Sequence, residues 1–347
     1  MCAFTNHLFD ALYLTGQSSF EPKSFINNRR EISLNFVDGE QEDAHEYLQS
    51  LLTSIHECCV RLSKVASMDS ESLITQVFGG RLRSQTRCCD CGHKSETFEP
   101  VTDLSLEISG ANDPFSAFES FTRLEMIDDP ENRFTCSNCN AKVTVEKQMT
   151  IDNAPQVLII HLKRFSFNGN IIKKNFQEVD FSLSMNLSPF VNNHVEEAGD
   201  LNYRLYAVIV HLGSPSYGHY VSFVHSDKKN WYLMSDEKVM MTRFEEVKKQ
   251  KAYILFYVKE GISSSSVKEF MIERFKRNFK AEEESCSSST SDESGCISDE
   301  MSNVCSPKVD EKSLHDKKAD TGEDEEVSNK NEEDEKKKRK AFDLKIS

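Results

Sequence analysis

Two pairs of cysteines constrain the fold of this chain more than any other feature. Cys88 and Cys91 form one Cys-x-x-Cys pair, Cys136 and Cys139 form a second, and 44 residues separate the pairs. Two thiolates at this spacing can bind one face of a tetrahedral ion, so two pairs complete a four-thiolate site with no open coordination position. We therefore predict a structural zinc ion that joins the two segments. The alternative is that the four cysteines are buried or incidental.

The chain has no run of 18 apolar residues and no signal-peptide pattern at residues 1–16. We expect an intracellular protein, in the nucleus and/or the cytoplasm, without membrane association. A zinc ribbon also occurs in proteins that bind nucleic acids. The net charge of −15 and the lack of a basic, aromatic-rich face argue against a nucleic-acid partner here. We expect a monomer.

Much of the negative charge lies at the C-terminal end. Residues 282–347 contain 20 acidic and 11 basic residues, and so carry −9 of the net charge. This Ser-, Glu- and Lys-rich composition predicts a disordered acidic tail. The basic cluster Lys336–Lys340 near its end fits a nuclear-import signal, and the alternative is an ordinary solvated charge run. Ahead of the tail, residues 261–281 predict an amphipathic helix, centred on Val267–Phe279.

The remainder, residues 1–260, predicts one domain with helices first and strands after them. Apolar residues at helical spacing predict helices at Thr5–Leu14, Asp43–Ser63 and Ser72–Phe78. Strands are predicted by alternation at Phe98–Ile108 and by apolar runs at Val157–Phe165 and Ala252–Val258, with a hairpin turn at Asn168–Asn170. This order of elements predicts the α+β class.

A histidine stands out in the segment Tyr203–Tyr257. His219 lies in a predicted glycine turn, Gly218-His219-Tyr220, between two strand-like runs, and the next strand, Trp231–Met234, ends at Ser235-Asp236. Such an arrangement can place an imidazole beside a side chain that orients it, which is half of a nucleophilic hydrolase site. Taken without this context, His219 is more simply a hairpin-turn histidine.

Several blocks of the sequence resemble the signature blocks of ubiquitin-specific proteases, in the family's order and over about residues 2–258. The blocks are Gln41–Leu48, Phe78–Gly80 with Leu82–Ser84, Leu162–Phe165, Tyr206–Val208, Gly218–Tyr220 and Ala252–Tyr257. The resemblance is strongest to plant ubiquitin carboxyl-terminal hydrolases and their animal relatives. It implies a papain-like fold, with a helical thumb, a β-rich palm, and fingers that carry a four-cysteine zinc ribbon.

The resemblance also implies an activity, hydrolysis by a thiolate of the bond after the C-terminal Gly of ubiquitin, with no catalytic cofactor. His219 matches the family's general base. Gln41, Asp43, His211 and Tyr220 match positions near the channel for the ubiquitin tail, and a carboxylate at Asp43 suits that arginine-rich tail. The plain alternatives are a helix-terminus charge for Asp43 and a strand histidine with a satisfied hydrogen bond for His211. We interpret His45 and His161 as structural.

Two departures from the family pattern affect the chemistry. The family's Gly-Asn-Thr-Cys box, expected several dozen residues before Gln41, does not occur in the 347 residues, and Cys2 lacks its context. We therefore expect an incomplete helical thumb without a nucleophile. After Trp231–Met234 the family has an orienting Asp or Asn, whereas this chain has Ser235 followed by Asp236. Either Ser235 accepts the hydrogen bond from His219 or Asp236 takes over as the orienting residue.

Three hypotheses remain open from the sequence. The chain is a piece of an active thiol protease, a non-catalytic homologue that binds ubiquitin, or a zinc-stabilised interaction module unrelated to ubiquitin. We favour the first, and predict that the 347 residues alone do not cleave ubiquitin.

Overall fold

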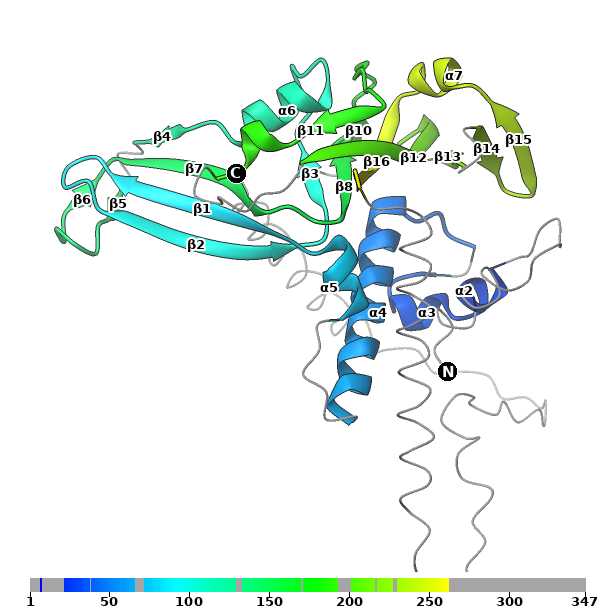
Figure 1. The fold of residues 1–347 in the computed structure, drawn as a ribbon, viewed down its shortest axis with the longest axis horizontal. Coiled ribbons are helices and arrows are strands. Elements are labelled where there is room, and N and C mark those ends of the chain that lie inside the picture. The colour runs from blue at the N-terminus through cyan, green and yellow to red at the C-terminus, as the bar shows by residue number, and fades with distance from the viewer. Residues whose placement is uncertain are drawn as a thin grey trace, which may run out of the picture. The chain divides into compact units, whose positions relative to one another are not determined.

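The computed structural model describes residue 7 and residues 22–37, 39–65, 72–128, 133–169, 171–192, 201–215, 217–226 and 230–261. All of them belong to one unit of the chain, Met1–Ser288 (Figure 1). The helix predicted at Thr5–Leu14 (apart from His7), the helix predicted at Val267–Phe279 and the predicted tail lie outside the described residues.

The helices come first in the described chain, as the sequence predicts. They are α2 (Lys23–Asn27), α3 (Arg29–Ile32), α4 (Ala44–Val65) and α5 (Leu73–Phe78). The predictions at Asp43–Ser63 and Ser72–Phe78 are confirmed, and each of these helices begins at a side-chain cap. The Ser72 hydroxyl accepts a hydrogen bond from the Thr75 N–H, and the Asp43 carboxylate accepts from two backbone N–H groups of α4.

The apolar face of α4 packs on a large sheet. Leu52 and Ile55 of α4 and Ile74 of α5 share a buried cluster with Ile159 and Ile254 from the sheet. Apolar side chains at helical spacing therefore fix which side of α4 faces the strands. None of the described helices is both long enough and apolar enough to cross a membrane.

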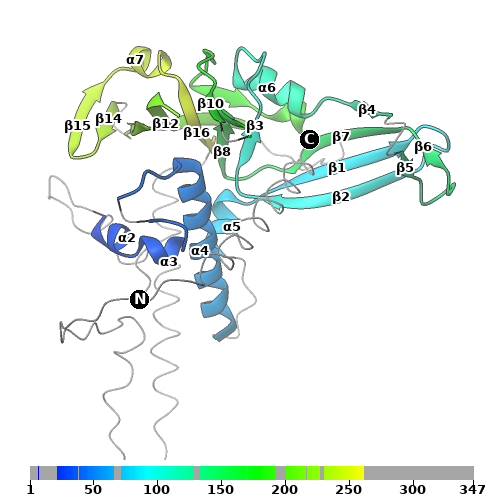
Figure 2. The same ribbon diagram turned by 180° about the vertical axis from the view of Figure 1, so that it is seen from behind.

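The large sheet is antiparallel except at one edge, where β3 and β8 are parallel. The order of its strands is β15-β14-β13-β12-β16-β8-β3, and β11 pairs with β12 (Figures 1 and 2). Their bounds are β3 (Leu104–Leu106), β8 (Val157–Leu162), β11 (Ser184–Asn186), β12 (Asn202–Ser214), β13 (Tyr217–His225), β14 (Trp231–Ser235), β15 (Lys238–Thr242) and β16 (Ala252–Lys259). The central strands are buried on both faces, so the main core of the described residues includes Leu158, Val208 and Leu255.

A second sheet, of order β2-β1-β7-β4, extends away from α4 and α5 in both views of the ribbon. Its strands are β1 (Gly80–Cys88), β2 (Lys94–Val101), β4 (Glu125–Ile127) and β7 (Val145–Asn153). A short hairpin, β5 (Phe134–Thr135) with β6 (Lys142–Val143), lies near its far end (Figure 1). The two Cys-x-x-Cys turns lie at this end, because β1 ends at Cys88 and the hairpin encloses Cys136 and Cys139.

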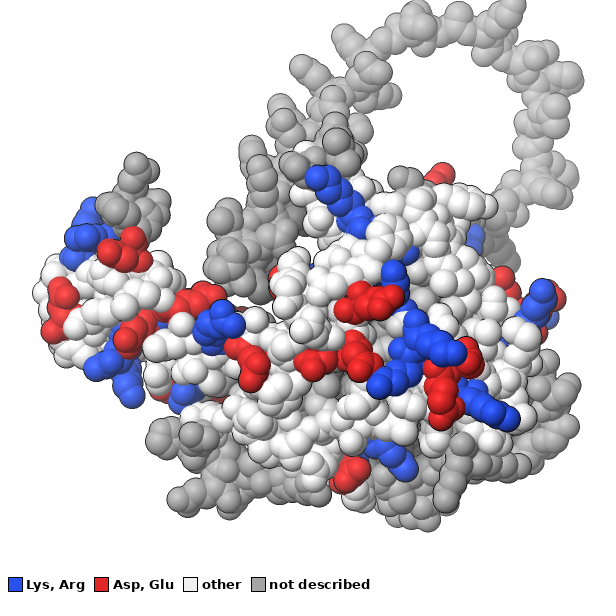
Figure 3. All heavy atoms as spheres, turned by 90° about the horizontal axis from the view of Figure 1, so that it is seen from above, with Lys and Arg blue, Asp and Glu red and all other residues white. Residues whose placement is uncertain are grey.

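The remaining elements are α6 (Pro114–Phe121), β9 (Phe165–Asn168), β10 (Ile171–Lys174), the 3-10 turn η1 (Ser188–Phe190) and α7 (Phe244–Lys248). The predicted hairpin turn is confirmed between β9 and β10, where Gly169 has φ +61°. The pattern analysis did not predict α6, although Asp113 begins it with a capping box. Acidic and basic side chains are interspersed over the face that Figure 3 shows. Lys248 of α7 lies 3.3 Å from Asp180.

Two predicted strands are each two strands in the structure. The run Phe98–Ile108 divides between β2 and β3, because β2 pairs with β1 of the second sheet whereas β3 pairs with β8 of the large sheet. The run Val157–Phe165 divides between β8 and β9 at Lys163-Arg164. Arg164 turns inward there and donates hydrogen bonds to three backbone carbonyls, those of Ala252, Asn175 and Gln177.

Candidate functional site

His219 is a strand residue, so the sequence interpretation that placed it in a turn is wrong. It is the third residue of β13 and pairs with Leu212 of β12, while Gly218 beside it pairs with Gly213. A Cβ atom on Gly218 would collide with the His211 ring and with the Leu212 carbonyl oxygen. Glycine is therefore required for the close approach of β13 to His211, and not for a turn.

One ring nitrogen of His219 is held and the other is not. Nε2 lies 2.9 Å from the Ser235 hydroxyl and 3.7 Å from Asp236 Oδ2. Nδ1 makes no hydrogen bond with any residue that the structure describes. Ser235 ends β14, and Asp236 follows it with φ +49° and a side chain that is 79% exposed. The closer oxygen, and the only one at hydrogen-bond distance, is the hydroxyl of Ser235.

Gln41 clamps the residue that precedes His219. Its side-chain amide donates to the Gly218 carbonyl over 3.0 Å and accepts from the Gly218 N–H over 3.1 Å. Gln41 lies just ahead of α4, so this pair of bonds joins the start of a helix to a strand 177 residues away.

Asp43 holds the residue that follows His219. One carboxylate oxygen caps α4 by accepting from the N–H groups of His45 and Glu46, at 2.8 and 3.0 Å. The other accepts from the hydroxyls of Tyr220 and Tyr253, at 3.2 and 2.6 Å. Burial, and then the charge of Asp43, raise the pKa of both tyrosines, so both hydroxyls remain donors.

The His211 ring is a buried neighbour of this site, and it contacts a lysine that the sequence analysis missed. The Lys174 ammonium, at the end of β10, lies 2.8 Å from His211 Nδ1 and donates to the carbonyls of His211 and Gly213 at 2.9 and 2.8 Å. Burial, followed by the nearby Lys174 charge, lowers the pKa of His211. His211 is therefore a neutral ring whose Nδ1 accepts, and all three Lys174 donors are used.

The four predicted metal ligands are brought together. The Sγ atoms of Cys88, Cys91, Cys136 and Cys139 all lie within 4.8 Å of one another, so this cluster could hold a metal ion. Cys91 Sγ and Cys136 Sγ are 3.7 Å apart. A tetrahedral zinc ion with bonds of about 2.3 Å places its sulfurs roughly 3.8 Å apart, which a small contraction of the cluster would reach.

The two turns of the cluster have matching backbones. The Gly92 N–H donates to the Cys88 carbonyl, and the Asn140 N–H donates to the Cys136 carbonyl, at 3.0 and 2.8 Å. Gly92 and Asn140 both have positive φ, +71° and +53°. Hydrogen bonds from the His93 N–H and the Asn138 amide lower the pKa of Cys91 to about 6, which favours the thiolate that a metal ion binds.

The other described cysteines do not meet His219. Cys58 and Cys59 lie on α4, and Cys89 is an exposed neighbour of the first pair, 4.0 Å from the Met126 sulfur. Within the described ranges, no cysteine forms a hydrogen bond with the His219 ring. The described residues therefore contain an oriented histidine and a possible metal centre at separate places.

Three features together define a class of protein. A helical part is clamped to a sheet, a histidine on that sheet has one oriented ring nitrogen, and a second sheet ends in four cysteines. This is the papain-like protease fold with a thumb, a palm and fingers. The helices α2–α5 correspond to the thumb, the large sheet to the palm, and the second sheet to the fingers.

Comparison with known proteins shows the family. The sequence model of the ubiquitin carboxyl-terminal hydrolase family matches residues 1–257. The chain is 40% identical over 265 residues to ubiquitin carboxyl-terminal hydrolase 23 of Arabidopsis thaliana, covering 75% of this chain and 30% of that protein. It is 35% identical over 263 residues to human ubiquitin carboxyl-terminal hydrolase 42, covering 19% of it. The chain belongs to the ubiquitin carboxyl-terminal hydrolase family, and it spans about a third or less of the length of these relatives.

Solved structures give the same assignment. The SAGA Ubp8/Sgf11/Sus1/Sgf73 DUB module bound to ubiquitin aldehyde aligns with a TM-score of 0.61 and 28% identity, over 70% of this chain and 55% of that one. The Ubp8-Sgf11-Sgf73-Sus1 SAGA DUB module aligns with a TM-score of 0.59 and 25% identity, over 75% of this chain and 58% of that one. The predicted α+β ubiquitin-specific protease fold is confirmed.

Proposed function

We propose that this chain supplies the histidine part of a deubiquitinating thiol protease site. His219 is the general base for hydrolysis of the bond that follows the C-terminal Gly of ubiquitin. The observation that carries this proposal is the geometry of the ring, with Nε2 held by Ser235 and Nδ1 without a partner among the described residues. A thiol protease needs its histidine oriented through one nitrogen while the other faces the thiol.

In the proposed reaction, Nδ1 of His219 takes the proton from a cysteine thiol. The thiolate forms a bond to the carbonyl carbon, the bond from that carbon to the leaving amine breaks, and the imidazolium returns its proton to the amine. Water then hydrolyses the thioester, again with His219 as the base. Ser235 orients the ring by a hydrogen bond, but its neutral hydroxyl does not stabilise the imidazolium as a carboxylate does.

The substrate-binding positions are part of the same proposal. Tyr220 follows His219 on β13, and Gln41, Asp43 and His211 contact this strand. We propose that they form the wall of the channel for the ubiquitin tail. Each is held in place by partners within the chain, so the wall is preorganised before ubiquitin binds.

The nucleophile is the missing component. None of the described cysteines contacts His219, and the 347 residues contain no Gly-Asn-Thr-Cys sequence. We therefore propose that the 347 residues alone bind ubiquitin without cleaving it, and that a cysteine on a Gly-Asn-Thr-Cys segment completes the site. The partner is proposed on the basis of a family relative of the same fold that was solved with ubiquitin aldehyde. The metal ion of the cysteine cluster is proposed to be zinc, in a structural role because four thiolates leave no open position.

Two measurements test the proposed function. First, labelled ubiquitin is titrated with the purified chain, and release of a fluorophore from the ubiquitin C-terminus is followed in parallel. We expect saturable binding and no release. Absence of binding contradicts the proposed partner, and release that His219→Ala abolishes contradicts the proposed lack of a nucleophile.

Second, a segment that carries a Gly-Asn-Thr-Cys box is fused ahead of residue 1. We expect this chimaera to cleave the fluorogenic substrate, and we expect both His219→Ala and replacement of the added cysteine by serine to abolish cleavage. A chimaera that binds ubiquitin but cleaves equally well after His219→Ala would show that His219 is not the base.

A further inference from the structure

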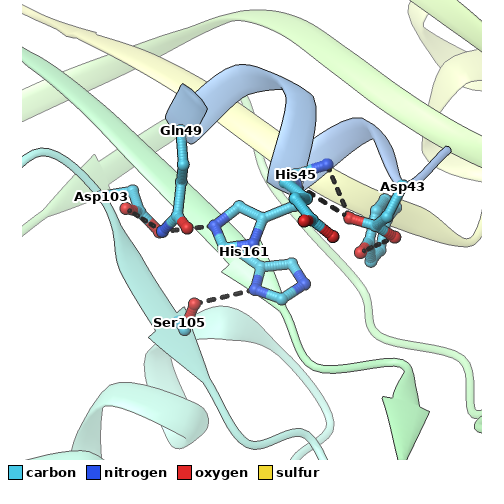
Figure 4. A network of polar contacts seen from close by, with 8 residues as sticks. Asp43, His45, Gln49, Asp103, Ser105 and His161 are labelled. Carbon is cyan, nitrogen blue, oxygen red and sulfur yellow. Dashed lines mark hydrogen bonds and ion pairs between the residues drawn. The ribbon is translucent and has the colours of Figure 1, made fainter. Parts of the chain in front are cut away.

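Side chains from α4, from β8 and from the chain around β3 form a polar network close to the start of α4 (Figure 4). His45 Nε2 lies 2.7 Å from Asp103 Oδ2, and the Gln49 amide donates to Asp103 Oδ1 over 3.0 Å. The His45 ring stacks on the His161 ring, with centroids 3.7 Å apart and planes 17° apart. Nδ1 of His161 lies 2.8 Å from the Ser105 hydroxyl.

The Asp103 carboxylate of this network is largely shielded from water. The side chains of His45 and Asp103 are only 12% and 10% exposed. Burial alone would raise the pKa of Asp103, but the hydrogen bonds from His45 and Gln49 and the charge of His45 leave that pKa below its usual value. Burial, and then repulsion from His45, lower the pKa of His161 to about 3, so His161 is neutral. Within this network His45 is the histidine that pairs with Asp103.

His45 connects this network to the residues around His219. Its side chain meets Asp103, while its backbone N–H donates to Asp43 Oδ1 over 2.8 Å. Asp43 in turn accepts from Tyr220, which follows His219, and Gln41 clamps Gly218, which precedes it. Hydrogen bonds thus lead from Asp103 through His45 and Asp43 to Tyr220. Gln41, two residues before Asp43 in the chain, holds Gly218.

The packing of α4 does not by itself set the position of that first turn. Leu52 and Ile55, which are buried against the sheet, lie two and three turns further along the helix, while Ala44 and Leu48, at its start, are only partly buried against the same cluster. Apolar burial is non-directional, so it tolerates a small rotation or slide of the helix about its axis. A hydrogen bond to a charged carboxylate is directional, so it fixes both the rotation of the helix and its position along the axis.

We propose that His45 and Asp103 are positioning residues for His219. Their pairing sets the first turn of α4, and Gln41 and Asp43 transmit that setting to strand β13. This inference rests on the proposed role of His219 as the general base.

The test reads the His219 ring directly in the full 347-residue chain labelled with ¹⁵N-histidine. The variants are Asp103→Asn, His45→Ala and His45→Gln, whose amide can still donate to Asp103. The control is Glu99→Gln, which makes the same charge change at an exposed position of β2. We expect Asp103→Asn and His45→Ala to shift the His219 ring resonances and the midpoint of their pH titration. We expect His45→Gln to keep the ring resonances and the titration midpoint close to those of the wild type, and Glu99→Gln to leave them unchanged.

A denaturant unfolding curve of each variant separates positioning from folding. A variant that loses stability but keeps the wild-type His219 resonances would overturn the inference, because the network would then only support the fold. Should Asp103→Asn not fold, the comparison of His45→Ala with His45→Gln decides alone. A His45→Gln signal as far displaced as that of His45→Ala would also overturn the inference.

The ring measurement needs no ubiquitin, so its outcome is independent of the proposed function. The chimaera tests the proposed function and the positioning role together. In the chimaera, Asp103→Asn is expected to lower kcat by as much as about 10²-fold with little change in KM. A chimaera without activity, combined with shifted His219 resonances, would contradict the proposed function and leave the positioning role supported. An unchanged kcat in an active chimaera would overturn the positioning role.

Discussion

At the scale of single residues, the most consequential contact is the one between His219 and Ser235. Nε2 is 2.9 Å from the serine hydroxyl, whereas Asp236 lies at 3.7 Å with a largely exposed side chain. A hydroxyl can fix the tautomer and the orientation of the ring, but it adds no negative charge beside the imidazolium. Ser235 therefore orients the His219 ring but gives a positive charge on that ring only weak electrostatic support.

This contact predicts the effect of restoring a carboxylate. In the chimaera, Ser235→Asp should raise kcat, because loss of the orienting carboxylate costs a serine protease about 10⁴-fold. Ser235→Ala should lower kcat, and Asp236→Asn is the matched control with a small effect. The measurement is fluorogenic ubiquitin hydrolysis for the four proteins. If Asp236→Asn is the damaging change and Ser235→Ala is silent, Asp236 is the orienting residue.

Lys174 is the second residue whose effect can be predicted. Its removal leaves His211 Nδ1 and the carbonyls of His211 and Gly213 without their donor. Lys174→Met should therefore lower the free energy of unfolding by about 1–3 kcal/mol. Lys173→Met, at the exposed neighbouring position, is the control and should stay within about 0.5 kcal/mol of wild type. Equal stabilities in urea for the two variants would contradict the role given to Lys174.

At the scale of secondary-structure elements, the second sheet depends on its cysteine end. β1 ends at Cys88, and the β5–β6 hairpin encloses the other pair, so the cluster joins two segments that share a small buried core of Cys88, Cys136, Val143 and Val145. A metal ion bound by all four thiolates would reinforce that small core.

We expect one zinc ion per chain by elemental analysis, and its loss in Cys91→Ser and Cys136→Ser. Removal of the ion by a chelator should also expose the amides of β5 and β6 to hydrogen exchange while the large sheet stays protected. Cys89→Ser is the matched control, because Cys89 is adjacent to the cluster without being one of its four members. Loss of zinc from Cys89→Ser with retention in Cys91→Ser would reassign the ligands.

At the scale of the whole molecule, the buried histidine predicts how stability depends on pH. The pKa of His161 is lowered to about 3 in the folded state, against about 6.5 in an unfolded chain. Between these values the unfolded state binds a proton that the folded state does not. His161 therefore contributes stability that is complete above about pH 6.5 and is lost as the pH falls. Asp103, with its lowered pKa, adds a further loss only below about pH 4.

Each pH unit in that window should cost about 1.4 kcal/mol, so acidification from pH 7 to pH 5 should lower stability by about 2 kcal/mol. Urea unfolding at a series of pH values measures this slope. His161→Gln should flatten the slope between pH 5 and pH 6.5, while His93→Gln, at an exposed position, should not. A slope that is unchanged by His161→Gln would mean that another group takes up the proton.

Local sequence patterns were sufficient to predict much of the fold of this molecule. The spacing of Leu48, Leu52 and Ile55 predicted α4 and its buried face, and the two Cys-x-x-Cys pairs predicted the cluster that the structure assembles. Both succeed because periodicity and short spacing are properties of a few neighbouring residues. The order of the signature blocks likewise identified the family.

Only the tertiary structure decided the partners of the individual side chains. Asp43 is a helix cap that also holds two tyrosines, Lys174 is bound to His211, and Asp103, between β2 and β3, pairs with His45. These contacts join residues from 37 to 210 positions apart, and any of several charged or polar residues could satisfy each group equally well by type. Their choice depends on which strands are adjacent and how closely Gly218 lets them approach. Sequence pattern thus determined the elements and the chemical groups, while strand adjacency and burial determined which of those groups surround His219.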